Sequence, residues 1–106
     1  MANTYINAKL DLTATSVTTL YTCPALTTGV VKSIIVSEDT GSADTITVTL
    51  TSGSSVYSLF KVKAIGANTT VELLTAPLIV QAGEILKVTA ATANRLHVVA
   101  SILEVT

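Results

Sequence analysis

The chain contains little charge and few aromatic side chains. Of its 106 residues only 12% are Asp, Glu, Lys or Arg, compared with about a quarter in an average globular protein. The six Lys and Arg residues are scattered and are offset by seven acidic residues, so no basic stripe is available to neutralise nucleic-acid phosphates. Only 4% of the residues are aromatic, which leaves few platforms for stacking a base or a sugar. We therefore expect no nucleic-acid partner, and the composition argues against carbohydrate binding.

The chain also lacks targeting signals and long apolar runs. Residues 1–7 contain no basic segment followed by an apolar run, and nowhere do roughly 18 apolar residues follow one another. We expect no membrane segment and synthesis in a cytoplasm. The single cysteine, Cys23, cannot form an internal disulfide, so stability must come from packing or from neighbouring subunits. The length suits one domain spanning residues 1–106.

Threonine and branched apolar residues alternate along much of the chain. In residues 44–51 every second residue is Thr, so one face of an extended chain is apolar and the other carries hydroxyls. The same pattern, interrupted by glycine-containing turns, predicts nine strands. They span residues 4–12, 17–22, 29–37, 44–51, 55–65, 69–74, 77–81, 84–91 and 95–104.

Short strands at intervals of about ten residues predict an all-β fold, an antiparallel β-sandwich of about eight strands. The longer link around residues 64–75 is typical of a Greek-key or jelly-roll crossover, so we expect a jelly-roll-like order. The core should consist of the positions that share one parity within each strand. These positions are Ile46, Val48, Leu50, Phe60, Val62, Leu86, Val88, Val98 and Ile102.

Two of the expected strands carry apolar side chains on both faces. A two-layer sandwich buries only one face of each sheet, so a second apolar face must contact something else. Val31 and Ile35 in one strand, and Val99 and Leu103 in the last strand, define this second face. The alternative is a scattering of singly exposed apolar residues, which every protein has. We favour a subunit contact and expect a homo-oligomer.

Lys61 and Lys63 share one face of another expected strand, beside Tyr57. They predict either the positively charged rim of an interface or a solvated edge strand that discourages sheet-to-sheet aggregation. The pattern does not separate the two readings.

The side chains that could perform chemistry are isolated from one another. His97 is the only histidine, so it cannot share a metal with a second one, and we interpret it as a surface or interface imidazole. Cys23 has no cationic neighbour in sequence that would activate it, so we interpret it as a small apolar filler. Glu38, Asp39 and Asp44 surround one loop but lack the regular acid spacing of calcium loops, so we favour a solvated acidic turn. We expect no enzyme activity, no cofactor and no metal.

Two stretches carry a resemblance to a known group of proteins. Residues 20–36, LYTCPALTTGVVKSIIV, resemble the "LYT-x-PA…V-K-S-I" opening of small β-sandwich structural proteins in tailed-bacteriophage particles. Residues 77–88, PLIVQAGEILKV, are similar to their "L-x-L-x-A-G-D/E-x-L-x-V" return strand. Together with residues 41–48 the resemblance covers most of the chain. The motifs mark a proline that ends a strand and a tight turn at Ala82–Gly83, devices that any jelly roll could use.

The resemblance implies a virion structural protein made in the host bacterial cytoplasm. Such proteins occur as capsid decoration (cement) proteins, often trimeric, and as parts of tails, necks and fibres. Because the chain lacks heptads and repeats, we expect it on the head, where a trimer at a capsid three-fold axis would bury the second apolar face and contact the major capsid protein. Residues 1–8 are a candidate arm that reaches a neighbour. The alternative is a tail, neck or fibre-associated module that binds a host-surface glycan or protein.

Overall fold

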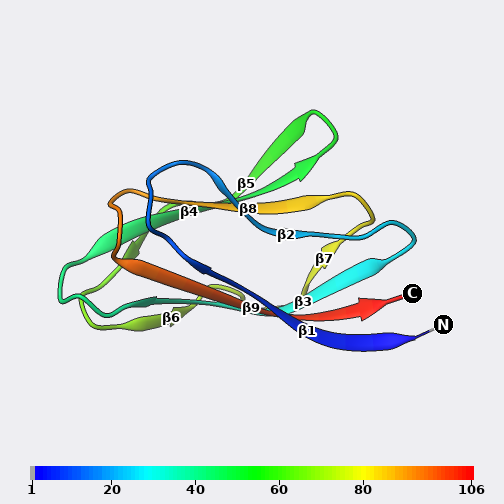
Figure 1. Ribbon diagram of the computed structural model, residues 1–106, viewed down its shortest axis with the longest axis horizontal. Helices are drawn as coiled ribbons and strands as arrows, with labels where there is room; N and C mark the ends of the chain where they lie inside the picture. Colours follow the sequence, from blue (N-terminus) through cyan, green and yellow to red (C-terminus); the bar gives the residue numbers. More distant parts are fainter. Residues whose placement is uncertain (1) are drawn as a thin grey trace.

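The computed structural model describes residues 2–106, and all regular secondary structure in this part of the chain is β-strand. Nine strands form two antiparallel sheets that lie one above the other (Figure 1). The strands are β1 Asn3–Asp11, β2 Thr18–Thr22, β3 Thr28–Glu38, β4 Asp44–Ser52, β5 Ser55–Ile65, β6 Thr70–Glu72, β7 Leu78–Val80, β8 Ile85–Ala90 and β9 Leu96–Val105. Each expected strand is present, with both ends within two residues of the prediction. The predicted all-β sandwich is confirmed.

The strand order is that of a long hairpin folded over into two layers. Sheet A contains β1, β9 and β3 in that order, and both β6 and β7 pair with the far side of β3. Sheet B has the order β2-β8-β4-β5. The first strand therefore pairs with the last, β2 with β8, β3 with β6 and β7, and β4 with β5. This is the jelly-roll-like order that the sequence predicts.

The core lies between the sheets and consists of the inward-facing side chains of both. Most of the predicted core is confirmed. Six predicted residues are buried: Ile46, Val48, Leu86, Val88, Val98 and Ile102. Leu50 and Phe60 are partly buried and pack against them.

Val62 is the exception, because it lies at a β-bulge. Its side chain is 60% exposed, so the prediction that it belongs to the core is wrong. Ile46 and Val48 are separated by one residue in β4, whereas their partners in β5 are separated by two. Val62 adopts a left-handed φ of 52°, and its N–H donates to the hydroxyl of Thr47 at 3.1 Å. The extra residue changes which side chains point inward.

A second bulge, at Lys32 in β3, moves Val31 into the core. Between Val31 and Ser33, β3 contains one residue more than the paired segment of β9. Val31 consequently has 0% exposure, and its expected place on the outer face beside Ile35 is wrong. Beyond the bulge the parity is reversed, so Ile34 points inward and Ile35 outward.

The two ends of the described chain lie at the same end of the sandwich (Figure 1). β1 pairs with β9 over its full length, from Asn3 opposite Val105 to Asp11 opposite His97. The candidate arm over residues 1–8 is therefore part of sheet A from residue 3 onward, because its backbone is used in the ladder; Met1 lies outside the described residues. Within residues 2–106, no helix is long and apolar enough to span a membrane.

Candidate functional site

The outer face of sheet A carries a row of four apolar side chains. Tyr5 in β1 lies opposite Leu103 in β9, Leu103 lies opposite Val30 in β3, and Val30 lies opposite Ile79 in β7. We call these four residues the apolar row. Tyr5 and Ile79, at its two ends, are 74% and 49% exposed, and the two central residues are half-buried. The row crosses four strands, so no neighbouring strand of the same sheet can cover it.

A second row on the same face places opposite charges at its two ends. Lys9 lies opposite Val99, Val99 opposite Ile35, and Ile35 opposite Glu72. We call these four residues the charged-end row. Val99 and Ile35 are 39% and 38% exposed. The centre of this row is therefore apolar, with one positive end at β1 and one negative end at β6.

Small polar residues separate the two rows. Asn7 lies opposite Ser101, which lies opposite Ser33 next to the Lys32 bulge. The face is hollowed here by a pocket of about 400 Å³, lined by Tyr5, Ile6, Asn7, Lys32, Ser101 and Ile102. Sheet A thus presents alternating apolar and polar bands to its surroundings.

Glu72 fills a gap in sheet A between β6 and β7. Residues 32–34 of β3 have no strand partner on this side, and Glu72 accepts hydrogen bonds from the Ile34 N–H at 2.9 Å and the Leu74 N–H at 3.1 Å. It also accepts one from the Ser33 hydroxyl. Burial alone would raise the pKa of Glu72, but these hydrogen bonds outweigh it and lower the pKa. The negative end of the charged-end row is therefore fixed in place and ionised at neutral pH.

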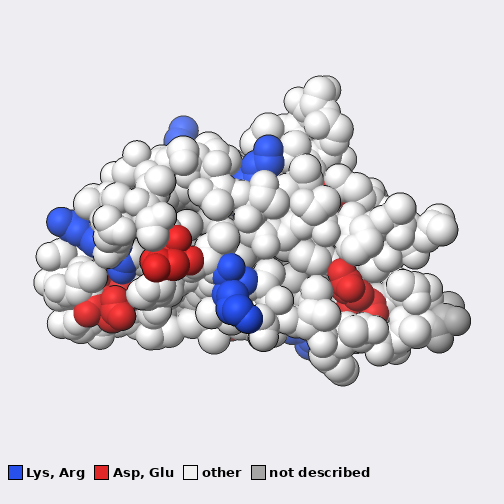
Figure 2. All heavy atoms as spheres, in the orientation of Figure 1, with Lys and Arg blue, Asp and Glu red and all other residues white. Residues whose placement is uncertain are grey.

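A second candidate surface is the uncharged hairpin between β4 and β5, which projects from the body of the sandwich (Figure 1). Residues 45–60 contain no charged side chain, and Figure 2 shows the projecting lobe without Lys, Arg, Asp or Glu. Val56 and Tyr57 are 64% and 56% exposed on it. We call residues 50–59 the hairpin arm.

Lys61 and Lys63 lie on the outermost strand of sheet B, just beyond the hairpin arm. β5 pairs only with β4, and both lysines are exposed. The reading as an edge strand agrees with this position, because exposed lysines and bulges on an edge hinder further strand pairing.

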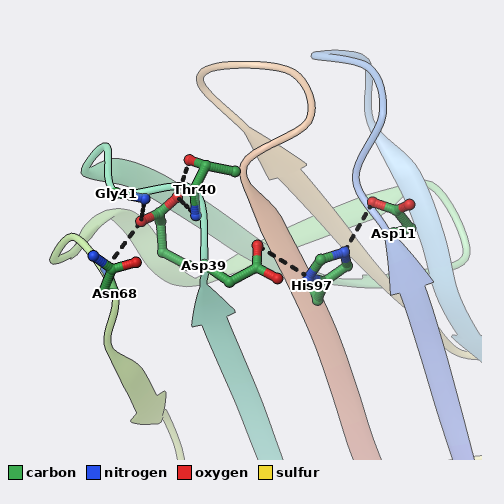
Figure 3. Close-up of polar contacts among 7 residues, drawn as sticks. Asp11, Asp39, Thr40, Gly41, Asn68 and His97 are labelled. Carbon is green, nitrogen blue, oxygen red and sulfur yellow. Dashed lines mark hydrogen bonds and ion pairs between the residues drawn. The ribbon is translucent and has the colours of Figure 1, made fainter.

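His97 lies between two carboxylates from different parts of sheet A (Figure 3). Its Nε2 is 3.3 Å from Asp11 at the end of β1, and its Nδ1 is 3.8 Å from Asp39 after β3. The imidazole is 44% exposed. His97 is thus a surface residue, as expected, and it links the ends of two strands. With Lys9 and Asp11 it also lines an open pocket of about 280 Å³.

Glu38 organises the loops beside His97 and is not part of a solvated turn. It is 2% exposed, and its carboxylate accepts hydrogen bonds from the hydroxyl and N–H of Thr40 and from the N–H groups of Gly41 and Asn68 (Figure 3). The Thr40 hydroxyl contributes most to lowering the pKa of Glu38 from 4.5 to about 2, and together with the N–H groups it outweighs the opposing effect of burial. The expectation of a solvated acidic turn is wrong for this residue, because the loop folds around the carboxylate.

The other expected chemical groups are also used in the fold. Cys23 is buried, and its thiol donates to the carbonyl oxygen of Thr27 at 3.3 Å. Asp44 is buried and accepts from the Thr92 N–H at 3.1 Å. Among residues 2–106, no group of three or more His, Cys, Asp or Glu side chains could hold a metal ion.

The structure brings together only part of the interface that the sequence predicts. Ile35 and Val99 are direct neighbours, and Leu103 lies four residues further along β9 in the apolar row. Tyr57, Lys61 and Lys63 belong to sheet B, on the other layer. The interface role of these residues stays a prediction.

Sequence reasoning missed four apolar residues of these two surfaces. Tyr5, Val30 and Ile79 belong to the apolar row, and Val56 lies on the hairpin arm. Val30 has the same parity as the buried Ile34 and Val36 and faces outward only because of the Lys32 bulge. Val56 has the parity of Phe60, which belongs to the predicted core. The row as a whole also depends on the register between distant strands.

No protein-family model and no curated protein matches the chain. Two solved structures are similar, both described as a pentameric capsid protein isolated from metagenomic phage sequences. The first is 21% identical, covers 93% of this chain and 59% of its own, and has a TM-score of 0.48. The second, solved by iodide SAD phasing, is 22% identical, covers 93% and 60%, and has a TM-score of 0.46. The chain spans about three fifths of the length of both neighbours.

Proposed function

We propose that the chain is a structural protein of a tailed-bacteriophage particle, acting as a capsid decoration (cement) protein that binds between capsomers and stabilises the head. The observation that carries this proposal is the exposure of apolar side chains on two separate surfaces, the outer face of sheet A and the hairpin arm. A single sandwich has no other element to cover them. Protein contacts on two sides are what a clip between subunits needs.

The two stretches that resemble phage structural proteins support the proposal because they form one unit in space. Residues 20–36 contain the second half of β2 and most of β3, and residues 77–88 contain β7 and most of β8. β2 pairs with β8 and β3 pairs with β7. The turn of the second stretch is tied to the first by two backbone hydrogen bonds, from Gly83 N to Cys23 O at 2.9 Å and from Cys23 N to Glu84 O at 3.0 Å.

A structural rather than enzymatic role is also supported by how the carboxylates are used. The two with lowered pKa values, Glu38 and Glu72, are each engaged by backbone N–H groups of their own surroundings. Such carboxylates stabilise loops and strand gaps.

We assign contact with the major capsid protein to the hairpin arm. It projects from the body, so it can reach a groove between capsomers, and residues 45–60 carry no charge that would have to be desolvated on burial. The contact should rest on apolar burial by Val56 and Tyr57 and persist at about 1 M salt, where exposed charges are screened beyond about 3 Å.

The experiment uses purified protein and undecorated phage shells. We would measure co-sedimentation across salt concentrations and the heat resistance of shells with and without the protein. The variant Val56→Ser/Tyr57→Ser should weaken binding at least about tenfold. Val17→Ser, which changes a residue 63% exposed outside both surfaces, is the matched control and should bind normally.

The competing function is a tail, neck or fibre-associated module that binds a host-surface glycan or protein. Shells that neither bind the protein nor gain heat resistance, while tails or host cells do bind it, would transfer the assignment to this class. Low-resolution imaging of particles carrying a labelled copy would give its position directly. The expected trimer is tested in the same preparation by its mass, three times the 10.9 kDa of one chain.

A further inference from the structure

The apolar row and the charged-end row make the outer face of sheet A complementary to the same face of a second copy. We propose that this face pairs with the same face of a second copy, about a two-fold axis that runs along the strands between β9 and β3. The inference deepens the proposed structural role, which requires contacts with other protein subunits.

The charges give the first argument. Lys9 and Glu72 occupy the two opposite ends of one row, separated by the apolar pair Val99 and Ile35. A two-fold axis along the strands exchanges the two ends of every row, so Lys9 of each copy meets Glu72 of the other. The interface then contains two equivalent opposite-charge contacts and no like-charge contact within this row.

The apolar residues give the second argument. The same axis places Tyr5 against Ile79 and Leu103 against Val30 in the apolar row. It also places Val99 against Ile35 in the charged-end row. Every apolar position of the two rows therefore meets an apolar position. An isologous contact requires self-complementarity of this kind.

The polar band between the rows is compatible with this pairing. Asn7, Ser101 and Ser33 are small and lie beside the hollow of about 400 Å³, and the exposed Lys32 at the bulge also lines it. The Lys32 ammonium needs water in this hollow, because the band offers it no carboxylate. Such a hollow retains water between the copies, so the polar groups of this band keep hydrogen-bond partners.

The other in-plane axis fits poorly. An axis across the strands, through the polar band, would place one row on the other. Tyr5 would meet Lys9, and Ile79 would meet Glu72, so each charge would lose its partner and contact an apolar side chain. Burying a charge without a partner is costly. An axis along the strands also leaves the strands of the two faces nearly parallel, as in aligned sheet packing.

The size of the face predicts a weak pair. Four strands spaced about 4.8 Å apart, with about eight residues at 3.3 Å each, give a flat area of roughly 500 Å² per copy. A standard stable interface buries about 800 Å² per partner. We therefore expect pairing at high micromolar concentration in solution, and stronger pairing where copies are held on one lattice.

The first test measures self-association by sedimentation equilibrium between about 10 µM and 1 mM. Lys9→Glu converts both opposite-charge contacts into like-charge contacts and should weaken pairing by roughly tenfold. Lys87→Glu makes the same charge change on β8 of sheet B and should leave pairing unchanged. Equal association of the two variants, or no association of the unmodified protein at 1 mM, would refute the proposal.

The second test distinguishes the two axes by cross-linking. A short bismaleimide that spans the about 10 Å between packed sheets should join a Tyr5→Cys chain to an Ile79→Cys chain. Tyr5→Cys chains alone should remain single, because their positions lie at opposite ends of the row, about 14 Å apart along the sheet. Cross-linking of Tyr5→Cys to Lys9→Cys chains instead would establish the other axis. Cys23 is buried. The unmodified protein is the control for any cross-linking through this cysteine.

The outcomes for pairing and for the proposed function are separable. If Lys9→Glu pairs as well as the unmodified protein while both bind shells, only the two-fold contact is refuted. If the protein pairs as described but no shell binds it, only the decoration function is refuted. A measured mass of two chains rather than three would show that the protein forms a dimer and not the expected trimer.

Discussion

Glu72 in β6 accepts a hydrogen bond from the backbone N–H of Ile34 in β3, at 2.9 Å, where a neighbouring strand would normally provide the acceptor. The side chain thereby stands in for the interrupted ladder between β6 and β7. This allows the outer strand of sheet A to break into two short pieces without leaving that N–H unpaired.

Replacing Glu72 by Ala should lower the free energy of unfolding by about 1–3 kcal/mol, because the Ile34 and Leu74 N–H groups lose their acceptor. Urea denaturation followed by circular dichroism measures this change. Asp39→Ala removes an exposed carboxylate just after β3 and should cost much less. Equal losses for the two variants would show that Glu72 does not complete the ladder.

Stability should fall in acid as Glu38 is protonated. Its pKa is lowered from 4.5 to about 2 in the folded chain, so the unfolded state binds the proton first. The contribution of Glu38 is therefore fully present above about pH 4.5 and is lost as the pH falls towards 2. Thermal unfolding between pH 2 and 7 should show this decline. In Glu38→Gln the same interval should be flatter, and an unchanged slope would contradict the assignment.

Val62→Gly should stabilise the protein, although it removes a side chain from a strand. Val62 has a φ of 52° and is 60% exposed, so a β-branched residue occupies a backbone region that glycine adopts freely. Relief of this strain should exceed the entropy that glycine adds to the unfolded chain and give a net gain of about 0.5–1 kcal/mol. Val56→Gly, at an exposed position of the same strand, should destabilise. A loss of stability for Val62→Gly would contradict the argument.

Gly29→Ala should destabilise the sandwich by about 1–3 kcal/mol. A Cβ atom at Gly29 would lie 3.0 Å from the hydroxyl of Tyr21 and 3.1 Å from its ring. That hydroxyl donates to Glu104 at 2.6 Å, and burial together with this hydrogen bond raises the pKa of Tyr21. Gly66→Ala is the control, since its Cβ would make only ordinary contacts with Thr69. Differential scanning calorimetry should separate the two variants clearly.

The strands could be predicted because their information is local. Alternation of Ile46, Val48 and Leu50 with threonine fixes both the extended backbone and the buried face. Alternation fails where a bulge inserts one residue, as it does before Ile34 and beside Val62. Val31 and Ile34 are three residues apart and both face inward. This spacing is the only local sign of the bulge at Lys32, and it is a weak one.

The interaction face could not be predicted to the same extent. Tyr5 and Leu103 become neighbours only when the first strand pairs with the last, and Val30 meets Ile79 only through the split outer strand. These registers depend on how the long hairpin folds over, and no local pattern specifies it. Ile35 and Val99 could be recognised as outward-facing, because the alternation within each of their own strands places them on the face opposite the core.

Near the chain ends, Ala2 and Thr106 are joined by hydrogen bonds, from Thr106 N to Ala2 O at 3.0 Å and from Ala2 N to Thr106 Oγ1 at 3.1 Å. Because these two residues are adjacent, a short peptide linker could join them and make the backbone circular. New ends could then be opened in an exposed loop, such as residues 13–16, and the same two sheets should assemble from a permuted sequence. A fused protein could thus be attached at either end of the sandwich.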